Sequence, residues 1–237
     1  MFTAEEHVFS RGLGNVDEKV LPPGVVCDKC NRRRLSVIDQ TLVDFPPIQQ
    51  FRTVLNLRTR TGRVAPTEWV NATVSSPEFG AIVIEDHGHD AFTDHGDGRL
   101  TTHFTTTRIS AAIYHRMMRA IYKIGLELIY LDRGPSVAFD PKFDELRSIV
   151  IGKLDDCPGW LILKRDAAPH AMVQAKYWYS QQLEDGTEIL PLVVDIFGME
   201  FWTELLARDP RHADDVPDAQ WNKYVFEAGL CGQVHAG

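Results

Sequence analysis

Apolar positions divide the chain into a loop-rich start, a helical middle and a strand-rich end. Residues 1–31 carry many glycines and prolines and predict mostly loop structure, with room for a hairpin. After residue 31, apolar residues recur at steps of three and four, which predicts a helix ending before Pro46-Pro47. The positions that carry this pattern are Leu35, Ile38, Leu42 and Phe45. A second helix is expected over residues 48–57.

The longest helical pattern runs from a capping Ser110 to about Leu131. Gly134-Pro135 is expected to end this helix, and another short helix is expected over residues 143–150. The apolar positions of the long helix are Ile113, Met117, Ala120, Ile121, Ile124, Leu128 and Leu131.

Aromatic and β-branched residues predict strands in the last third of the chain. These strands are expected over 160–164, 172–180 and 189–197, with a turn at 184–186. Residues 199–206 fit a strand or a short helix, and the charged residues from 208 onward predict a peripheral tail. Shorter strands are expected over 70–74 and 81–85, and a polar loop over 85–98.

These elements predict an α+β fold with two units. Residues 1–45 would form a small ββα module of the treble-clef type. Residues 46–237 would form a larger α+β domain, with one long helix packed on an antiparallel sheet.

Composition narrows the class of protein. The chain has 237 residues, of which 44% are hydrophobic and 24% are charged, as in ordinary globular proteins. The formal net charge of −8 means that binding to nucleic acid would depend on a local basic patch. No apolar run is long enough for a membrane span, and no signal peptide is apparent. Only two of the four cysteines are closely spaced, which favours a reducing cytoplasm.

The start of the chain holds the residues with the clearest chemistry. Glu6-His7 is followed by Cys27-Asp28-Lys29-Cys30-Asn31 and then by three arginines, Arg32, Arg33 and Arg34. A histidine can activate a water molecule as a general base, and a carboxylate can hold a divalent cation at a phosphate. Arginine side chains suit phosphate oxygens. This combination predicts hydrolysis of phosphodiester bonds.

The order of these residues resembles the bacterial HNH endonuclease family, in the branch with the pattern EHV/I, GG and CxxCN. The matching segments are Glu6-His7-Val8-Phe9, Gly12-Leu13-Gly14 and Val26–Asn31. A less specific similarity covers Arg108, His115, Lys123-Ile124-Gly125, Asp140–Asp144, Arg147 and Ile151-Gly152.

The resemblance implies a metal-dependent endonuclease that cuts DNA, or RNA, with Mg²⁺ or Mn²⁺. His7 would be the general base, Glu6 and Asn31 the metal ligands, and Asn15 the middle asparagine of the family. Family members carry a further CxxC before the EH pair, and this chain has no cysteine before Glu6. Cys27 and Cys30 supply only two of the four ligands that a structural zinc requires. A homodimer or a protein partner would help an acidic protein to hold DNA.

Two alternatives remain open. One is a catalytically inactive protein of HNH origin that binds a nucleic acid or a protein. The other is a metallohydrolase that uses the loop 85–97, because imidazole and carboxylate groups bind zinc, manganese or iron. The candidate ligands in that loop are Glu85, Asp86, His87, His89, Asp90, Asp94, His95 and Asp97.

Overall fold

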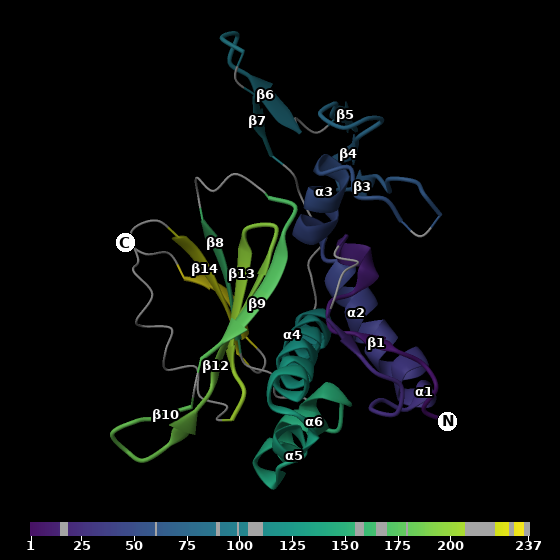
Figure 1. Cartoon of the computed structure of the whole chain (residues 1–237). Helices are drawn as coiled ribbons and strands as arrows, with labels where there is room; N and C mark the ends of the chain where they lie inside the picture. Colours follow the sequence, from purple (N-terminus) through teal and green to yellow (C-terminus); the bar gives the residue numbers. More distant parts are fainter. Residues whose placement is uncertain are drawn as a thin grey trace.

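The structure is a computed structural model. It describes residues 1–14, 19–59, 61–88, 91–98, 100–103, 111–154, 159–164, 170–178, 180–206, 221–227 and 230–234. Three layers are visible in Figure 1: an antiparallel sheet, the long helix α4 (Ala111–Arg133), and the N-terminal hairpin with helix α2 (Ser36–Val43). Helix α4 contacts the sheet through strands β9 and β13, and it contacts α2 as well.

The sheet has six strands in the order β15-β14-β8-β13-β12-β9, and every neighbouring pair is antiparallel. Side chains alternate in burial along β12: Leu192, Val194 and Ile196 are fully buried, whereas the residues between them are half-buried. This period of two shows that one face of the sheet packs on the core. The strands are β8 (Gly159–Lys164), β9 (Val173–Tyr177), β12 (Pro191–Ile196), β13 (Met199–Glu204), β14 (Trp221–Glu227) and β15 (Leu230–Val234).

Helix α4 is buried around most of its circumference, because the sheet covers one side and α2 the other. A helix in this position is expected to be apolar all round. Lys123 and Glu127 are the buried charged residues of α4. A Cβ atom at Gly125 would lie 2.8 Å from Cδ2 of both Leu192 and Leu205, so this glycine allows the helix to approach the sheet.

The N-terminal layer is a short hairpin followed by helices. Strand β1 (Glu6–His7) pairs with β2 (Val20–Leu21), and residues 28–43 then form one helical stretch. That stretch consists of α1 (Asp28–Cys30), the π-helical segment η2 (Asn31–Leu35) and α2. Helix α3 (Pro46–Val54) begins with two prolines, which suit the first turn of a helix.

The remaining elements flank these layers. A three-stranded sheet and two hairpins lie outside the main sheet, and two short helices follow α4. The elements are β3 (Thr67–Glu68), β4 (Ala72–Ser75), β5 (Val83–Asp86), β6 (Phe92–Asp94), β7 (Leu100–Thr102), β10 (Gln181–Gln182), β11 (Glu188–Ile189), α5 (Pro135–Ala138) and α6 (Asp144–Val150), with single turns at Arg11–Leu13 and Pro141–Phe143.

The structure confirms the mixed α+β class and the long helix that ends before Gly134-Pro135. The expected cap, Ser110, lies outside the described residues. Residues 199–204 form a strand, which the sequence left open. The expectation of a peripheral tail is wrong for residues 221–227 and 230–234, because β14 pairs with β8 and β15 pairs with β14, which adds both strands to the main sheet. The loop 85–98 is partly strand, since β5 and β6 extend into it.

One hydrophobic core joins the two units expected from the sequence. It includes Val8, Ile38 and Leu42 from residues 1–45, together with Ile121 and Phe201 from the rest of the chain. The hairpin and α2 therefore pack as a layer of the whole molecule.

Candidate functional site

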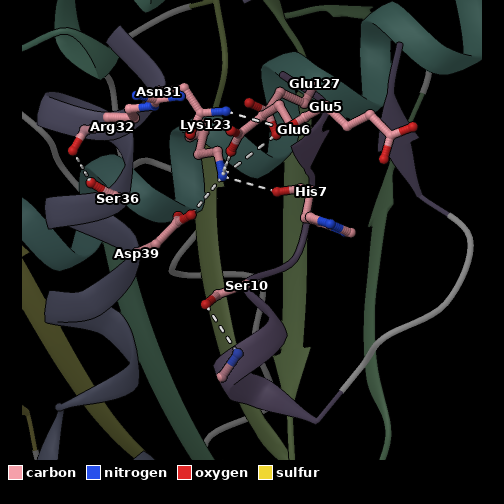
Figure 2. A network of polar contacts seen from close by, with 11 residues as sticks. Glu5, Glu6, His7, Ser10, Asn31, Arg32, Ser36, Asp39, Lys123 and Glu127 are labelled. Atoms are coloured by element: carbon pink, nitrogen blue, oxygen red, sulfur yellow. Dashed lines mark hydrogen bonds and ion pairs between the residues drawn. The ribbon is translucent and has the colours of Figure 1, made fainter. Parts of the chain in front are cut away.

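The candidate site is a buried ionic cluster around Lys123, in the middle of α4 (Figure 2). Its Nζ atom lies 2.5 Å from Oε1 of Glu6, 2.8 Å from Oδ2 of Asp39 and 3.7 Å from Oε2 of Glu127. Nζ also donates a hydrogen bond of 3.0 Å to the backbone oxygen of His7. The side chain of Lys123 is 1% exposed, so the whole ammonium group is removed from solvent.

Local structure explains why these side chains converge. Successive side chains of a strand point to opposite faces, so Glu6 faces the core while His7 does not. Asp39 follows the buried Ile38 on α2, the helix that packs against α4. Glu127 lies one turn after Lys123, and residues four apart share one side of a helix.

Hydrogen-bond counting separates Glu127 from the other acceptors. An ammonium group has three N–H donors. Glu6, Asp39 and the carbonyl of His7 lie within hydrogen-bond distance of Nζ and account for all three. Oε2 of Glu127 is buried and has no hydrogen-bond partner.

The protonation states follow from burial and from the charge count. Burial alone would lower the pKa of Lys123, but the neighbouring carboxylates raise it above its ordinary value. Burial raises the pKa of Glu6 and of Asp39, and Lys123 partly offsets both shifts. Burial raises the pKa of Glu127 well above its ordinary value of 4.5. Glu127 therefore holds its proton where a free glutamate is ionised, while Lys123 remains charged.

The structure does not bring the predicted nuclease residues to one point. The carboxylate of Glu6 is bound by Lys123, and the amide of Asn31 donates 3.2 Å to the backbone oxygen of Glu5. Figure 2 shows the imidazole of His7 pointing away from the Lys123 cluster. Asn15 lies outside the described residues.

His7 itself is half-buried at the end of β1. Burial lowers its pKa, and the nearby charge of Arg11 adds to the effect. The imidazole is therefore neutral near neutral pH, which is the form a general base needs.

Cys27 and Cys30 lie at the start of the helical stretch 28–43, and both are free cysteines. The Cys30 amide donates to Sγ of Cys27 over 3.1 Å. A hydrogen bond from the Cys30 side chain lowers the pKa of Cys27, and this backbone bond adds to the effect. Within the described residues, no group of three or more histidine, cysteine or acidic side chains could hold a metal ion. The zinc site stays a prediction with two candidate ligands.

The three arginines differ in their surroundings. Arg34 donates to the backbone oxygen of Ile151 over 2.9 Å, so it links η2 to the end of α6. Arg32 and Arg33 are exposed on the first turns of the helical stretch. These two side chains are therefore accessible for the phosphate contacts that the sequence predicts.

The described part of the 85–97 segment uses its polar groups in turns and between strands. Asp86 accepts from the amides of Gly88 and Ala91, and Asp94 accepts from that of Gly96. His87 and His95 bond to threonine hydroxyls of neighbouring strands. His89 and Asp90 lie outside the described residues, and the metallohydrolase alternative stays a prediction.

The ionic cluster of Lys123 with Asp39 and Glu127 was not predicted from the sequence. A signal was present, because Lys123 and Glu127 stand four residues apart among the apolar positions of the long helix. A buried lysine requires a partner of opposite charge. Its partners on β1 and α2 are far away in sequence, so their identity needed the fold.

Comparison with protein-family models, with curated proteins and with solved structures gives no match. Among the helices of the described residues, none has the length and hydropathy needed to cross a membrane.

Proposed function

We propose that this chain is a nucleic-acid-binding protein of HNH-like architecture that does not cut its target. The observation that carries the proposal is the ammonium group of Lys123 bound to Glu6. The hairpin β1–β2 followed by a helix with Cys27, Cys30 and Asn31 at its start has the element order expected of a ββα module.

The position of Lys123 argues against a metal ion on Glu6. A divalent cation requires carboxylate oxygens that are free to bind it. Glu6 already contacts a permanent positive charge, and expelling that charge would leave it buried without partners. Lys123 thus supplies the cation that the acidic residues of the cluster need.

The expected contact surface for nucleic acid is the start of the helical stretch 28–43. Arg32 and Arg33 expose guanidinium groups there, which bind phosphate oxygens through charge-assisted hydrogen bonds. The net charge of −8 makes such a local patch necessary. Contacts to phosphates alone give binding that is tolerant of sequence and sensitive to salt.

A second candidate function is the metal-dependent endonuclease expected from the sequence. Two features of His7 favour it: partial exposure and a pKa shift that keeps the imidazole neutral. In this reading Glu6 would have to leave Lys123 when metal and nucleic acid bind. Asn31 lies beside β1 and could follow the same rearrangement.

A paired binding and cleavage assay separates the two functions. Fluorescent duplex DNA and single-stranded RNA are titrated with protein, and supercoiled plasmid is incubated with Mg²⁺ or Mn²⁺. We expect salt-sensitive binding, weaker binding in Arg32→Ala/Arg33→Ala, and no cleavage. Arg63→Ala removes an exposed arginine outside this patch and serves as the control. Metal-dependent cleavage that disappears in His7→Ala would establish the nuclease instead, and absence of binding would reject both functions.

A further inference from the structure

The main sheet ends at strand β9, beside α4 (Figure 1). Within the described residues, β9 pairs with β12 on one side and with no strand on the other. The outer side of such an edge strand presents unpaired backbone N–H and C=O groups, which can pair with an added strand. No proline within β9 prevents this pairing.

Two hydrogen bonds show which backbone groups of β9 face the open edge. The amide of Trp178 donates to the backbone oxygen of Pro191 over 3.1 Å. The amide of Phe197 donates to the backbone oxygen of Met172 over the same distance. Residues of an antiparallel strand alternate between its two sides, so the even-numbered residues from 172 to 178 bond to β12. The backbone groups of the odd-numbered residues, Ala175 among them, therefore point to the open edge.

A groove of about 460 Å³ lies along this edge. Residues 175–177 of β9 form one side of it, and Lys19 and the C-terminal part of α4 form the rest. The lining residues of α4 are Leu128, Asp132 and Arg133. Neighbouring strands lie about 4.8 Å apart, so an added strand would occupy the part of the groove next to β9.

The charges of the groove indicate an acidic occupant. Three cationic side chains, those of Lys19, Arg133 and Lys176, line it together with one acidic side chain, that of Asp132. Lys19 and Lys176 are exposed, and neither forms an ion pair within the described residues. The guanidinium of Arg133 lies over the ring of Tyr177, 5.3 Å from its centroid. Opposite charges across an interface select the partner, so carboxylates are favoured here.

The groove suits a peptide better than two other occupants. A second copy of the chain would bring the same excess of positive charge against itself, which is unfavourable. A nucleic acid could supply phosphates to Lys19 and Lys176, but it lacks the alternating N–H and C=O groups that pair with a strand. An extended peptide has both the backbone groups and, if it is acidic, the charge.

We propose that an extended acidic segment of a partner protein pairs with the open edge of β9 and adds a strand to the main sheet. Main-chain hydrogen bonds to Ala175 and Tyr177 hold its backbone, and its carboxylates bind Lys19 and Lys176. The site goes beyond the proposed nucleic-acid binding, and it does not involve the arginines at the start of the helical stretch 28–43.

Three fluorescein-labelled peptides test this binding by fluorescence anisotropy with the full chain. The first is the acidic peptide TEVEVET, and the second is its lysine analogue TKVKVKT. The third is the acidic peptide with methyl groups on two consecutive central amide nitrogens, which blocks backbone pairing. We expect the acidic peptide to bind at least about tenfold more tightly than either of the others. No binding of the acidic peptide, or equal affinity for it and either analogue, would overturn the proposal.

Two variants locate the site. Ala175→Pro removes an outward amide without removing a bond to β12, because the open side of an edge strand accepts proline. It should weaken binding of the acidic peptide at least about tenfold. Lys19→Glu should weaken the acidic peptide by a similar factor and strengthen binding of the lysine analogue. Lys153→Glu makes the same charge change at an exposed position outside the groove, and it should leave both affinities unchanged.

Circular dichroism and thermal melting check that each variant folds. Unchanged affinity for the acidic peptide in a folded Ala175→Pro variant, or in a folded Lys19→Glu variant, would overturn the assignment.

Two further measurements test the other occupants. Sedimentation velocity of the protein alone reports self-association, and a dimer that is lost in Ala175→Pro would assign the edge to a second copy. Anisotropy with labelled oligothymidylate reports nucleic-acid binding. Binding that is lost in Lys19→Glu but kept in Arg32→Ala/Arg33→Ala would assign the groove to nucleic acid. Either result would overturn the proposal, and we expect neither.

Discussion

Lys123 connects the stability of the fold to the proposed function. Its side chain joins β1, α2 and α4 through Glu6, Asp39, Glu127 and the carbonyl of His7. Removing one member of a buried ion pair leaves its partners uncompensated, which costs more than the pair itself contributes. The stability of the fold and the proposed absence of a metal ion on Glu6 therefore depend on the same ammonium group, that of Lys123.

Replacing Lys123 by methionine should lower the free energy of unfolding by about 3–5 kcal/mol at neutral pH. The loss should be smaller under mildly acidic conditions, because the stranded carboxylates can then take up protons. Urea denaturation at both pH values measures the difference. Lys142→Met is the matched control, since its partly exposed pair with Glu188 should contribute less than about 1 kcal/mol.

Glu127 contributes to folding stability in a pH-dependent way, and comparison with Glu127→Gln isolates this contribution. Its pKa is raised by burial in the folded state, so the folded protein binds this proton more tightly than the unfolded chain does. The stabilisation that this group contributes is complete below its ordinary pKa of 4.5, and it decreases as the pH rises toward the pKa of the folded state. Relative to Glu127→Gln, the wild type should therefore lose stability as pH increases from acidic to alkaline. A constant difference between the two proteins across the pH range would contradict the assignment.

At the scale of elements, the contact between α4 and the main sheet depends on Gly125. A Cβ atom there would lie within 3.0 Å of side-chain carbons of Leu192 and Leu205, both of which are buried. Gly125→Val should cost about 1–3 kcal/mol through overpacking. Ala112→Val, at an exposed position of the same helix, is the control and should change the urea midpoint little. A loss at Gly125 no larger than that at Ala112 would contradict overpacking, because valine is a better helix former than glycine and a poorer one than alanine.

The elements also show what the sequence could predict. The apolar steps of α2 and α4 and the prolines at 46–47 and 135 were sufficient to place these helices. Strands β14 and β15 were missed because a charged, proline-containing tail precedes them and pairing with β8 is not local. The Glu6-His7 and CxxC patterns located the hairpin and the helix start. These patterns did not predict the ion pair of Glu6, because its partner comes from a helix more than a hundred residues later.

At the scale of the whole molecule, the shared core predicts a single cooperative unfolding transition. A fragment of residues 46–237 would lack Glu6 and Asp39 and would bury Lys123 with Glu127 alone. We expect this fragment to remain unfolded or aggregate, as judged by near-ultraviolet circular dichroism and amide exchange. A folded fragment with a protected α4 would show that the N-terminal layer is an independent unit.

In the proposed arrangement a lysine ammonium group, rather than a metal ion, neutralises the acidic residues at the hairpin. Nuclear magnetic resonance of ¹⁵N-labelled lysine side chains tests this most directly, with the signal of Lys123 assigned by its absence in Lys123→Met. We expect a protected ammonium signal at neutral pH that stays unchanged when excess Mg²⁺ is added. A signal that shifts or disappears on addition of Mg²⁺, but stays in place when Glu6→Gln is combined with the metal, would contradict it.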